Sequence, residues 1–421
     1  MNRGFYTIMS AQFFSSLADN ALLFVAISLL TSMNAPASLT PLLKLSFVLF
    51  YVLLAAFVGA FADSLPKGRV MFIANLIKIF GCALMFFSVH PLLAYAVVGF
   101  GAAVYSHAKY GILTELLPPE KLVPANGWIE GLTVMSIILG TVLGGALISE
   151  RGGAFLLGVD LLPGIDTGIH TGNHAAMAVV VGIYMLAALF NLRIPDTGAR
   201  YEHQERNPIK LIADFANCSA TLWRDKLGQV SLAVTTLFWG AGATLHFIVL
   251  KWAERSLQMP LDKATNLIGV VAIGVALGAA MAAKMIPLRK SLNVIPLGII
   301  MGLVVCSMIF VSSVIVAYPL LALIGFLSGF FVVPMNALLQ HRGHVLMSAG
   351  HSIAVQNFNE NLSILTMLAM YAVMISLNLD LDVIVVIFGM SVAGIMFLIQ
   401  RRHLANQREH DSLGLIGEGK H

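Results

Sequence analysis

The sequence predicts an all-α membrane protein with twelve transmembrane helices in two six-helix halves. Hydrophobic residues make up 58% of the 421 residues, charged residues only 11%, and the mean hydropathy is +0.87. A soluble protein carries about 25% charged residues, so this chain has too little polar surface to cover a water-soluble globule. Lipid is therefore the main solvent of the folded chain. About twenty apolar residues cross a bilayer as a helix, and we find twelve segments of roughly that length.

Short turn sequences such as NAPASLTP, SVHP and LLPPEKLVP separate the apolar segments. The longest polar stretch divides them six and six. We therefore expect an N-terminal half at 1–194, a cytoplasmic central loop at 195–226, a C-terminal half at 227–402 and a cytoplasmic tail at 403–421. The expected spans are 5–32, 42–62, 68–88, 91–113, 124–149, 172–192, 228–250, 263–286, 291–313, 317–339, 345–376 and 381–400.

The distribution of basic residues predicts that both termini lie on the cytoplasmic side of the membrane. With the N-terminus inside, 18 of the 25 Lys and Arg residues fall on the inside and 4 on the outside, as the positive-inside rule requires. The first apolar run is kept as a span and is not a signal peptide, because Asp19 and Asn20 interrupt it and no clean cleavage site follows. Six spans on each side of a basic loop are typical of transporters built from two repeats.

Several other functions are disfavoured by composition and motifs. Cys82, Cys218 and Cys306 have spacings that fit neither a metal site nor a disulfide framework, so we expect no cofactor and no metal ion. The basic residues form no patch with interleaved aromatic residues, so we expect no nucleic-acid partner. The motifs HExxH and GxxxxGK[ST], and the histidine–aspartate pattern of acyltransferases, are absent. A membrane-embedded lipid-modifying enzyme is thus the weaker alternative, and we expect a non-enzymatic monomer.

The stretch GAFADSLPKGR at 59–69 resembles the signature between spans 2 and 3 of the major facilitator superfamily. Gly59 and Asp63 fit that signature, whereas Gly68 and Arg69 come two residues later than in the common form. Together with ADNALLF, YSHAKYGILTEL, TTLFWGAGATLHF, GFFVVPMNALLQ and AVQNFNEN, it is similar to the bacterial lysophospholipid transporter family over nearly all the membrane part.

The resemblance implies import of lysophosphatidylethanolamine and lysophosphatidylglycerol across the inner membrane. It also implies alternating access of the two halves and re-acylation of the product by an acyltransferase on the cytoplasmic side. The sequence departs from the family at His246, where we expect arginine in the relatives. The main alternative is a proton-coupled small-molecule or drug exporter of the same superfamily. The absence of an arginine in span 4 argues against that alternative.

Ionisable groups inside spans are costly, so each is a functional hypothesis. Asp19 lies roughly 21 Å along the first helix from Phe5, near the middle of the membrane. It could bind an amine or a coupling cation, pair with a cation on another helix, or cap a local break together with Asn20. Lys109 shares a helix face with Tyr105, four residues away, and the two are suited to hold a phosphate. Snorkelling to the headgroups is the alternative for Lys109.

Span 11 carries a polar stripe that cannot face lipid tails without large cost. Gln356 and Glu360 fall on one row and Asn357 on the adjoining row, which favours cavity lining over hydrogen bonding between helices. His246 either contacts the headgroup or bonds between helices. The predicted substrate-binding residues are thus Asp19, Asn20, Tyr105, Lys109, His246, Gln356, Asn357 and Glu360.

A second group of charged residues lies near the cytoplasmic ends of the spans. The superfamily resemblance implies that the loop between spans 2 and 3 latches the two halves together. The predicted gating residues are Asp63, Lys67, Arg69, Glu115 and Glu130.

Four further positions complete the expectations. Lys44 and Lys78 lie near span edges, where we expect their side chains to snorkel. Gly140 and Gly144 have the small-xxx-small spacing that lets two helices approach closely.

Overall fold

The computed structural model describes residues 3–35, 39–158, 169–199, 207–259, 261–409 and 416. Within these residues the regular elements are all helices, and eleven of them are long and apolar enough to cross a membrane. A twelfth span results if α2 (Leu39–Leu53) and α3 (Ala55–Ser64), which are bent by 68° at the break between them, count as one. The predicted fold class, an all-α membrane protein with twelve spans, is confirmed.

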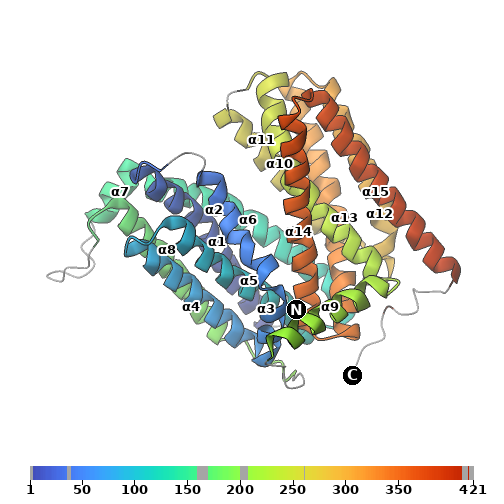
Figure 1. The fold of residues 1–421 in the computed structure, drawn as a ribbon, viewed down its shortest axis with the longest axis horizontal. Helices are drawn as coiled ribbons and strands as arrows, with labels where there is room; N and C mark the ends of the chain where they lie inside the picture. Colours follow the sequence, from blue (N-terminus) through green and yellow to red (C-terminus); the bar gives the residue numbers. More distant parts are fainter. Residues whose placement is uncertain are drawn as a thin grey trace. The chain divides into compact units, whose positions relative to one another are not determined.

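The first compact unit comprises Met1–Ile112 and Met135–Leu211. Its helix α8 packs against both α1 and α4, and all three appear in the blue to green half of Figure 1. Its core is apolar, with Tyr184 and Leu22 fully buried. Besides α2 and α3, the helices of this unit are α1 (Arg3–Ser32), α4 (Lys67–Phe86), most of α5 (Pro91–Leu116), the second half of α6 (Leu122–Ile148), α7 (Glu150–Leu157) and α8 (Gly172–Leu192).

The second unit comprises Leu113–Val134 and Ile212–His421. Its longest helix, α13, packs against α11 and α10, and α12 packs against α15. The two prolines inside α13, Pro319 and Pro334, are tolerated because neighbouring helices can satisfy the freed backbone groups. The elements of this unit are η1 (Pro119–Lys121), α9 (Pro208–Arg224), α10 (Gly228–Ser256), α11 (Leu261–Met285), η2 (Leu288–Val294), α12 (Ile295–Cys306), η3 (Ser307–Phe310), α13 (Val314–Leu346), α14 (Ala349–Ser376) and α15 (Leu381–Glu409).

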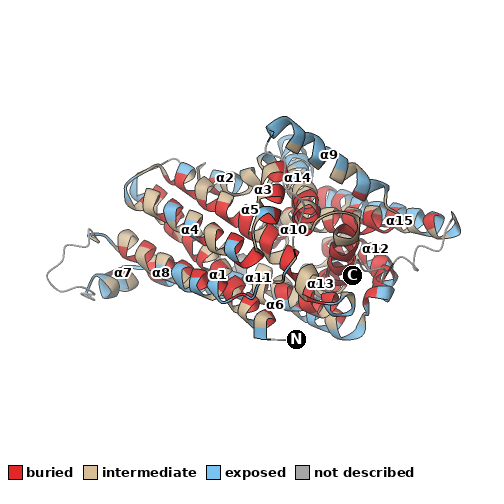
Figure 2. Cartoon of the chain, turned by 90° about the horizontal axis from the view of Figure 1, so that it is seen from below, coloured by how far each residue is buried: buried red, intermediate tan, exposed pale blue. Residues whose placement is uncertain are grey.

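The helices expose large apolar side chains as well as burying them. Figure 2 shows buried and exposed positions along many of the helices. Phe80 is 58% exposed, Phe310 83% and Ile315 84%. Exposed apolar surface on this scale is what a helix bundle presents to lipid tails, since the backbone groups are already satisfied within each helix.

Most predicted spans agree with the observed helices, and α8 has the predicted bounds of 172–192. Three predictions differ. The second span breaks at Leu54, where no glycine or proline marks it in the sequence. The central loop, predicted as a polar stretch, contains the helix α9, and the predicted tail begins with the helical end of α15, which runs to Glu409.

The division into halves at the central loop stays a prediction. In the structure, Leu113–Val134 packs with the second unit, although it precedes the central loop in the sequence. This segment contains the end of α5, η1 and the first half of α6.

The predicted close helix approach at Gly140 and Gly144 is confirmed. A Cβ at Gly140 would lie 2.6 Å from Asn20 Cβ, and one at Gly144 would lie 2.9 Å from the carbonyl oxygen of Ala21. The two glycines therefore let α6 contact the backbone of α1.

Candidate functional site

A buried ion pair lies inside the first unit. Lys78 Nζ, on α4, is 2.8 Å from Asp19 Oδ2, on α1, and the lysine side chain is 1% exposed. Tyr184, on α8, donates its hydroxyl hydrogen to Asp19 Oδ1 at 2.6 Å. The expectation that Lys78 snorkels is therefore wrong. Its side chain points into the unit because Asp19 compensates its charge there, which makes burial of the ammonium tolerable.

Further polar and aromatic groups surround the ammonium of Lys78. It donates to Ser15 Oγ at 3.0 Å, and Ser15 donates in turn to Asn75 Oδ1 at 2.8 Å. The ring centroids of Tyr105 and Tyr184 lie 5.0 Å and 5.5 Å from Nζ, within the range of cation–π attraction. We call these residues the Asp19–Lys78 network: Ser15, Asp19, Asn75, Lys78, Tyr105 and Tyr184.

The network excludes one of the alternatives for Asp19, whereas its binding of an amine or a coupling cation stays a prediction. The helix α1 runs unbroken from Arg3 to Ser32, so Asp19 does not cap a local break. Its carboxylate pairs with a cation on another helix and keeps 20% of its side chain exposed. Asn20 donates to the Ser16 carbonyl at 2.8 Å along the same helix.

The two residues that were predicted to share a phosphate contact different neighbours. Tyr105 is buried against Lys78, whereas Lys109 Nζ lies 4.2 Å from the ring centroid of Tyr110. Lys109 is half-buried. Its contact with a phosphate stays a prediction.

The polar stripe of α14 lies inside the second unit. Gln356, Asn357 and Glu360 are all buried. Gln356 Nε2 donates to Glu360 Oε1 at 2.8 Å and to Asn336 Oδ1, on α13, at 3.2 Å. Gln356 Oε1 is buried and has no hydrogen-bond partner among the described residues, so it can accept from a donor of a ligand. His246, on α10, is half-buried beside Phe247.

The predicted gating residues occupy different environments. Asp63 and Lys67 are both buried and form an ion pair of 2.5 Å across the turn from α3 to α4. Lys67 Nζ also donates to the Ala62 carbonyl at 2.7 Å. Arg69 is exposed, Glu115 half-buried and Glu130 buried. Their role as a latch stays a prediction.

Sequence reasoning missed two polar pairs in the second unit. Asn126, on α6, and Gln340, on α13, exchange two hydrogen bonds. Arg342, also on α13, binds both carboxylate oxygens of Asp225, through Nε at 3.2 Å and Nη2 at 2.6 Å. The sequence does carry a signal for these pairs. The amide of Gln340 and the guanidinium of Arg342 stand in an apolar run, where a polar group without a partner is costly.

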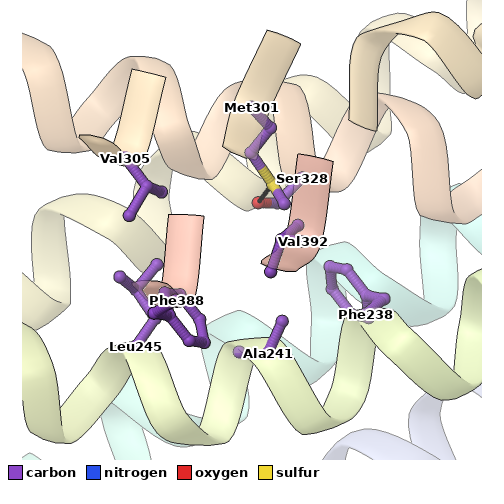
Figure 3. A pocket seen from close by; sticks show the side chains of 9 residues that line it. Phe238, Ala241, Leu245, Met301, Val305, Ser328, Phe388 and Val392 are labelled. Carbon is purple, nitrogen blue, oxygen red and sulfur yellow. Dashed lines mark hydrogen bonds between the residues drawn. The ribbon is translucent and has the colours of Figure 1, made fainter. Parts of the chain in front are cut away.

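The second unit also holds a small apolar pocket between α10, α12, α13 and α15. In Figure 3 the side chains of Phe238, Leu245 and Phe388 line a common space. Ser328 is the polar side chain among the lining residues, and its hydroxyl is already bonded to the Ile324 carbonyl at 2.7 Å. A Cβ on Gly242 would meet no atom within 4 Å. The pocket therefore suits an apolar group.

The described residues include no group of three His, Cys, Asp or Glu side chains placed to hold a metal ion.

Apolar spanning helices that enclose ion pairs and polar stripes define the class of multi-pass membrane transporters. The sequence matches the family model described as Major Facilitator Superfamily over residues 8–366. The chain belongs to this superfamily, and within it to the family of the lysophospholipid transporter LplT.

Relatives and solved structures agree with this assignment. The chain is 40% identical over 379 residues to the lysophospholipid transporter LplT of Yersinia enterocolitica, covering 90% of this chain and 89% of that protein. It is 39% identical to the LplT protein of Yersinia pestis, covering 90% of this chain and 88% of that protein.

Among solved structures, the fold is similar to the transporter FucP in the outward conformation, with a TM-score of 0.70, 14% identity and coverage of 95% and 98%. It is also similar to a bacterial homologue of the iron transporter ferroportin in its outward-facing state, with a TM-score of 0.72, 13% identity and coverage of 97% and 100%. These two likenesses show the shared fold.

Proposed function

We propose that the protein imports lysophospholipids, such as lysophosphatidylethanolamine and lysophosphatidylglycerol, across the bacterial inner membrane by alternating access. Both termini lie in the cytoplasm, and the product is re-acylated there by an acyltransferase. The protein acts as a monomer and performs no covalent chemistry itself. The proposal is supported by the relatives named lysophospholipid transporters and by the excess of Lys and Arg on the side of the termini.

The observation that carries the proposal is the ion pair between Asp19 and Lys78. A lysophosphatidylethanolamine headgroup contains a phosphate and an ammonium, the same two charge types as this pair. Because the Asp19 carboxylate is partly exposed, an ammonium can approach it, and the phosphate can then take the place of Asp19 beside Lys78. A headgroup would thus exchange one set of ionic contacts for another at little electrostatic cost.

The other predicted substrate-binding residues are proposed to contact other groups of the lysophospholipid. In the first unit, Lys109 contacts a phosphate. In the second unit, His246 can contact a phosphate, and Glu360, bonded to Gln356, can contact an ethanolamine amine or balance a cation. The single acyl chain lies against apolar helix surfaces and projects sideways between helices towards the bilayer.

Uptake of radiolabelled lysophosphatidylethanolamine into vesicles tests the proposal. We expect Asp19→Asn and Lys109→Ala each to reduce the uptake rate about tenfold or more, because a hydrogen bond to a charged group contributes about 1.5–3 kcal/mol. Lys251→Ala is the matched control, since Lys251 is 55% exposed and pairs with Glu254 at the protein surface.

Unchanged uptake in both Asp19→Asn and Lys109→Ala would remove these residues from the mechanism. Proton-driven dye efflux from cells, without any effect of the protein on lysolipid, would instead support the exporter alternative.

A further inference from the structure

The helix α9 of the central loop has three stripes of side chains, each with helical spacing. Leu211, Phe215, Cys218 and Leu222 face the protein and are partly or fully buried. A second stripe is polar, and its five residues are all exposed: Lys210, Asp214, Asn217, Thr221 and Arg224. A third stripe is apolar and mostly exposed: Ile209, Ile212, Ala216, Ala220 and Trp223.

The inward stripe fixes how the helix is rotated. Leu222 is fully buried in a cluster with Leu232, Leu339 and Val355. The ring of Phe215 packs edge to face on Phe358 of α14, with centroids 5.4 Å apart. This packing leaves the other two stripes facing outwards, and α9 is largely pale blue in Figure 2.

The end of α9 is held by polar contacts as well. Asp225 follows the helix directly, pairs with Arg342 and accepts the backbone N–H of Gly228 at 2.7 Å, the first residue of the spanning helix α10. The side chain of Asn406, on α15, donates to the Lys226 carbonyl at 3.1 Å. The rotation of α9 is therefore set by the fold and not by what lies outside it.

The outward apolar stripe is unusual for a segment that faces only water. Ile209 is 78% exposed, Ile212 54% and Trp223 40%. Trp223 is five residues before the first residue of α10, so it lies at most about 17 Å from the start of a spanning helix. That short connection places the end of α9 at the depth of the membrane boundary, where tryptophan is enriched.

From these observations we propose that the apolar stripe Ile209, Ile212, Ala216, Ala220 and Trp223 is inserted into the cytoplasmic leaflet of the bilayer. The helix then lies in the plane of the interface, with its polar stripe towards water. The charges fit this arrangement. Arg224 lies at the edge of the polar stripe next to the apolar stripe, Lys210 lies in the middle of the polar stripe, and Asp214 lies at its far edge, so the basic groups are nearer than the carboxylate to anionic lipid phosphates.

The proposal gives the central loop a role besides connecting two helix bundles. A helix that is packed on α14 and inserted in one leaflet fixes the second unit at that leaflet's surface. It also places two basic residues beside the lipid headgroups that surround the transporter.

Nitroxide labels on α9 test the proposal in the full-length protein, reconstituted into vesicles of phosphatidylethanolamine and phosphatidylglycerol. Single cysteines are introduced as Ile212→Cys, with Ile209→Cys as a second site, in a background where Cys82, Cys218 and Cys306 are replaced. The matched control is Asn217→Cys on the polar stripe of the same helix. Collision rates with oxygen, which concentrates in lipid, and with a water-soluble nickel chelate are measured by electron paramagnetic resonance.

We expect the ratio of oxygen to nickel collisions to be several-fold higher at Ile212 and Ile209 than at Asn217. Equal ratios at the three sites would overturn the proposal, because the apolar stripe would then lie in water. A label at Ile212 that is immobilised and shielded from both reagents would overturn it too, since the stripe would then be covered by protein, including a second copy of the chain.

Discussion

Asn126 on α6 and Gln340 on α13 form a reciprocal pair of amides. Asn126 Nδ2 donates to Gln340 Oε1 at 2.8 Å, and Gln340 Nε2 donates to Asn126 Oδ1 at 3.0 Å. Both side chains are buried, and Asn126 also donates to the Leu122 carbonyl at 2.9 Å. Because both bonds form only when the two helices are correctly aligned, the pair fixes the first half of α6 against α13.

Gln340→Leu should lower the thermal stability of the detergent-solubilised protein. Removing one amide leaves the buried Asn126 side chain without this partner, at a cost of about 1–3 kcal/mol. The double variant Asn126→Leu/Gln340→Leu removes both amides and should recover part of that loss. The melting temperatures of the native protein, Asn126→Leu, Gln340→Leu and the double variant form a double-mutant cycle. Strictly additive losses would show that the pair contributes no coupling.

Lys78→Met should lower the stability of the protein, and its comparison with a double variant should distinguish a structural role of the Asp19–Lys78 network from a role in transport. The substitution leaves a carboxylate uncompensated inside the first unit, which costs about 3–5 kcal/mol. The double variant Asp19→Asn/Lys78→Met removes both charges and should be more stable than Lys78→Met alone. It should still fail in lysolipid uptake, because the headgroup then lacks the two charges with which it exchanges ionic contacts.

Melting temperature and vesicle uptake, measured on the same preparations, check this prediction. Normal uptake by the double variant would assign the pair a structural role alone.

Gly140→Ala should destabilise the contact between α1 and α6. Its added methyl group would lie 2.6 Å from Asn20 Cβ and 2.9 Å from the Leu17 carbonyl oxygen, so a backbone must shift. Overpacking of this kind costs about 1–3 kcal/mol. Gly145→Ala on the same helix is the matched control, because a Cβ there meets nothing within 4 Å. Equal melting temperatures for the two variants would contradict the close approach.

The sequence predicted the spans well because each needs a long apolar run, and such runs are visible without knowledge of the fold. It also located Gly140 and Gly144, whose spacing alone indicates a close helix contact. The helix α9 was missed because its apolar residues form two separate stripes interrupted by Lys210, Asp214 and Asn217. No run there is long enough to suggest a span.

The candidate site was predicted only in part, since the sequence does not show which helix faces which. Asp19 was recognised because a carboxylate inside a span is costly. Its partner Lys78 is distant in sequence and was expected to snorkel, although position 78 is the middle of the predicted span 68–88. Tyr184 gave no signal, because a tyrosine in an apolar helix is common. Tyr105 was paired with Lys109 by helical spacing, whereas packing between helices placed its ring beside Lys78.

The exposed ion pair between Arg255, at the end of α10, and Asp380, just before α15, should make stability depend on pH in the acidic range. Arg255 Nη2 is 2.7 Å from Asp380 Oδ2, and the backbone N–H of Asp382 donates to Asp380 Oδ1 at 3.0 Å. The hydrogen bond from Arg255, and then that from Asp382, lower the pKa of Asp380 below its ordinary value. A carboxylate with a lowered pKa stabilises the fold above its unfolded pKa, and this contribution is lost as the pH falls through the folded pKa.

The difference in melting temperature between the native protein and Asp380→Asn should therefore be largest near neutral pH and vanish below the lowered pKa. It should be small throughout, because both side chains are about half exposed and water screens the pair. In an Arg255→Gln background, the change in melting temperature caused by Asp380→Asn should depend less on pH. The hydrogen bond from Arg255, the larger of the two that lower the pKa of Asp380, is then gone. Melting curves recorded from neutral pH to about pH 3 test this prediction. A difference in melting temperature between the native protein and Asp380→Asn that stays constant with pH would contradict it. Asp380 would then contribute through its backbone contact to Asp382 and not through its charge.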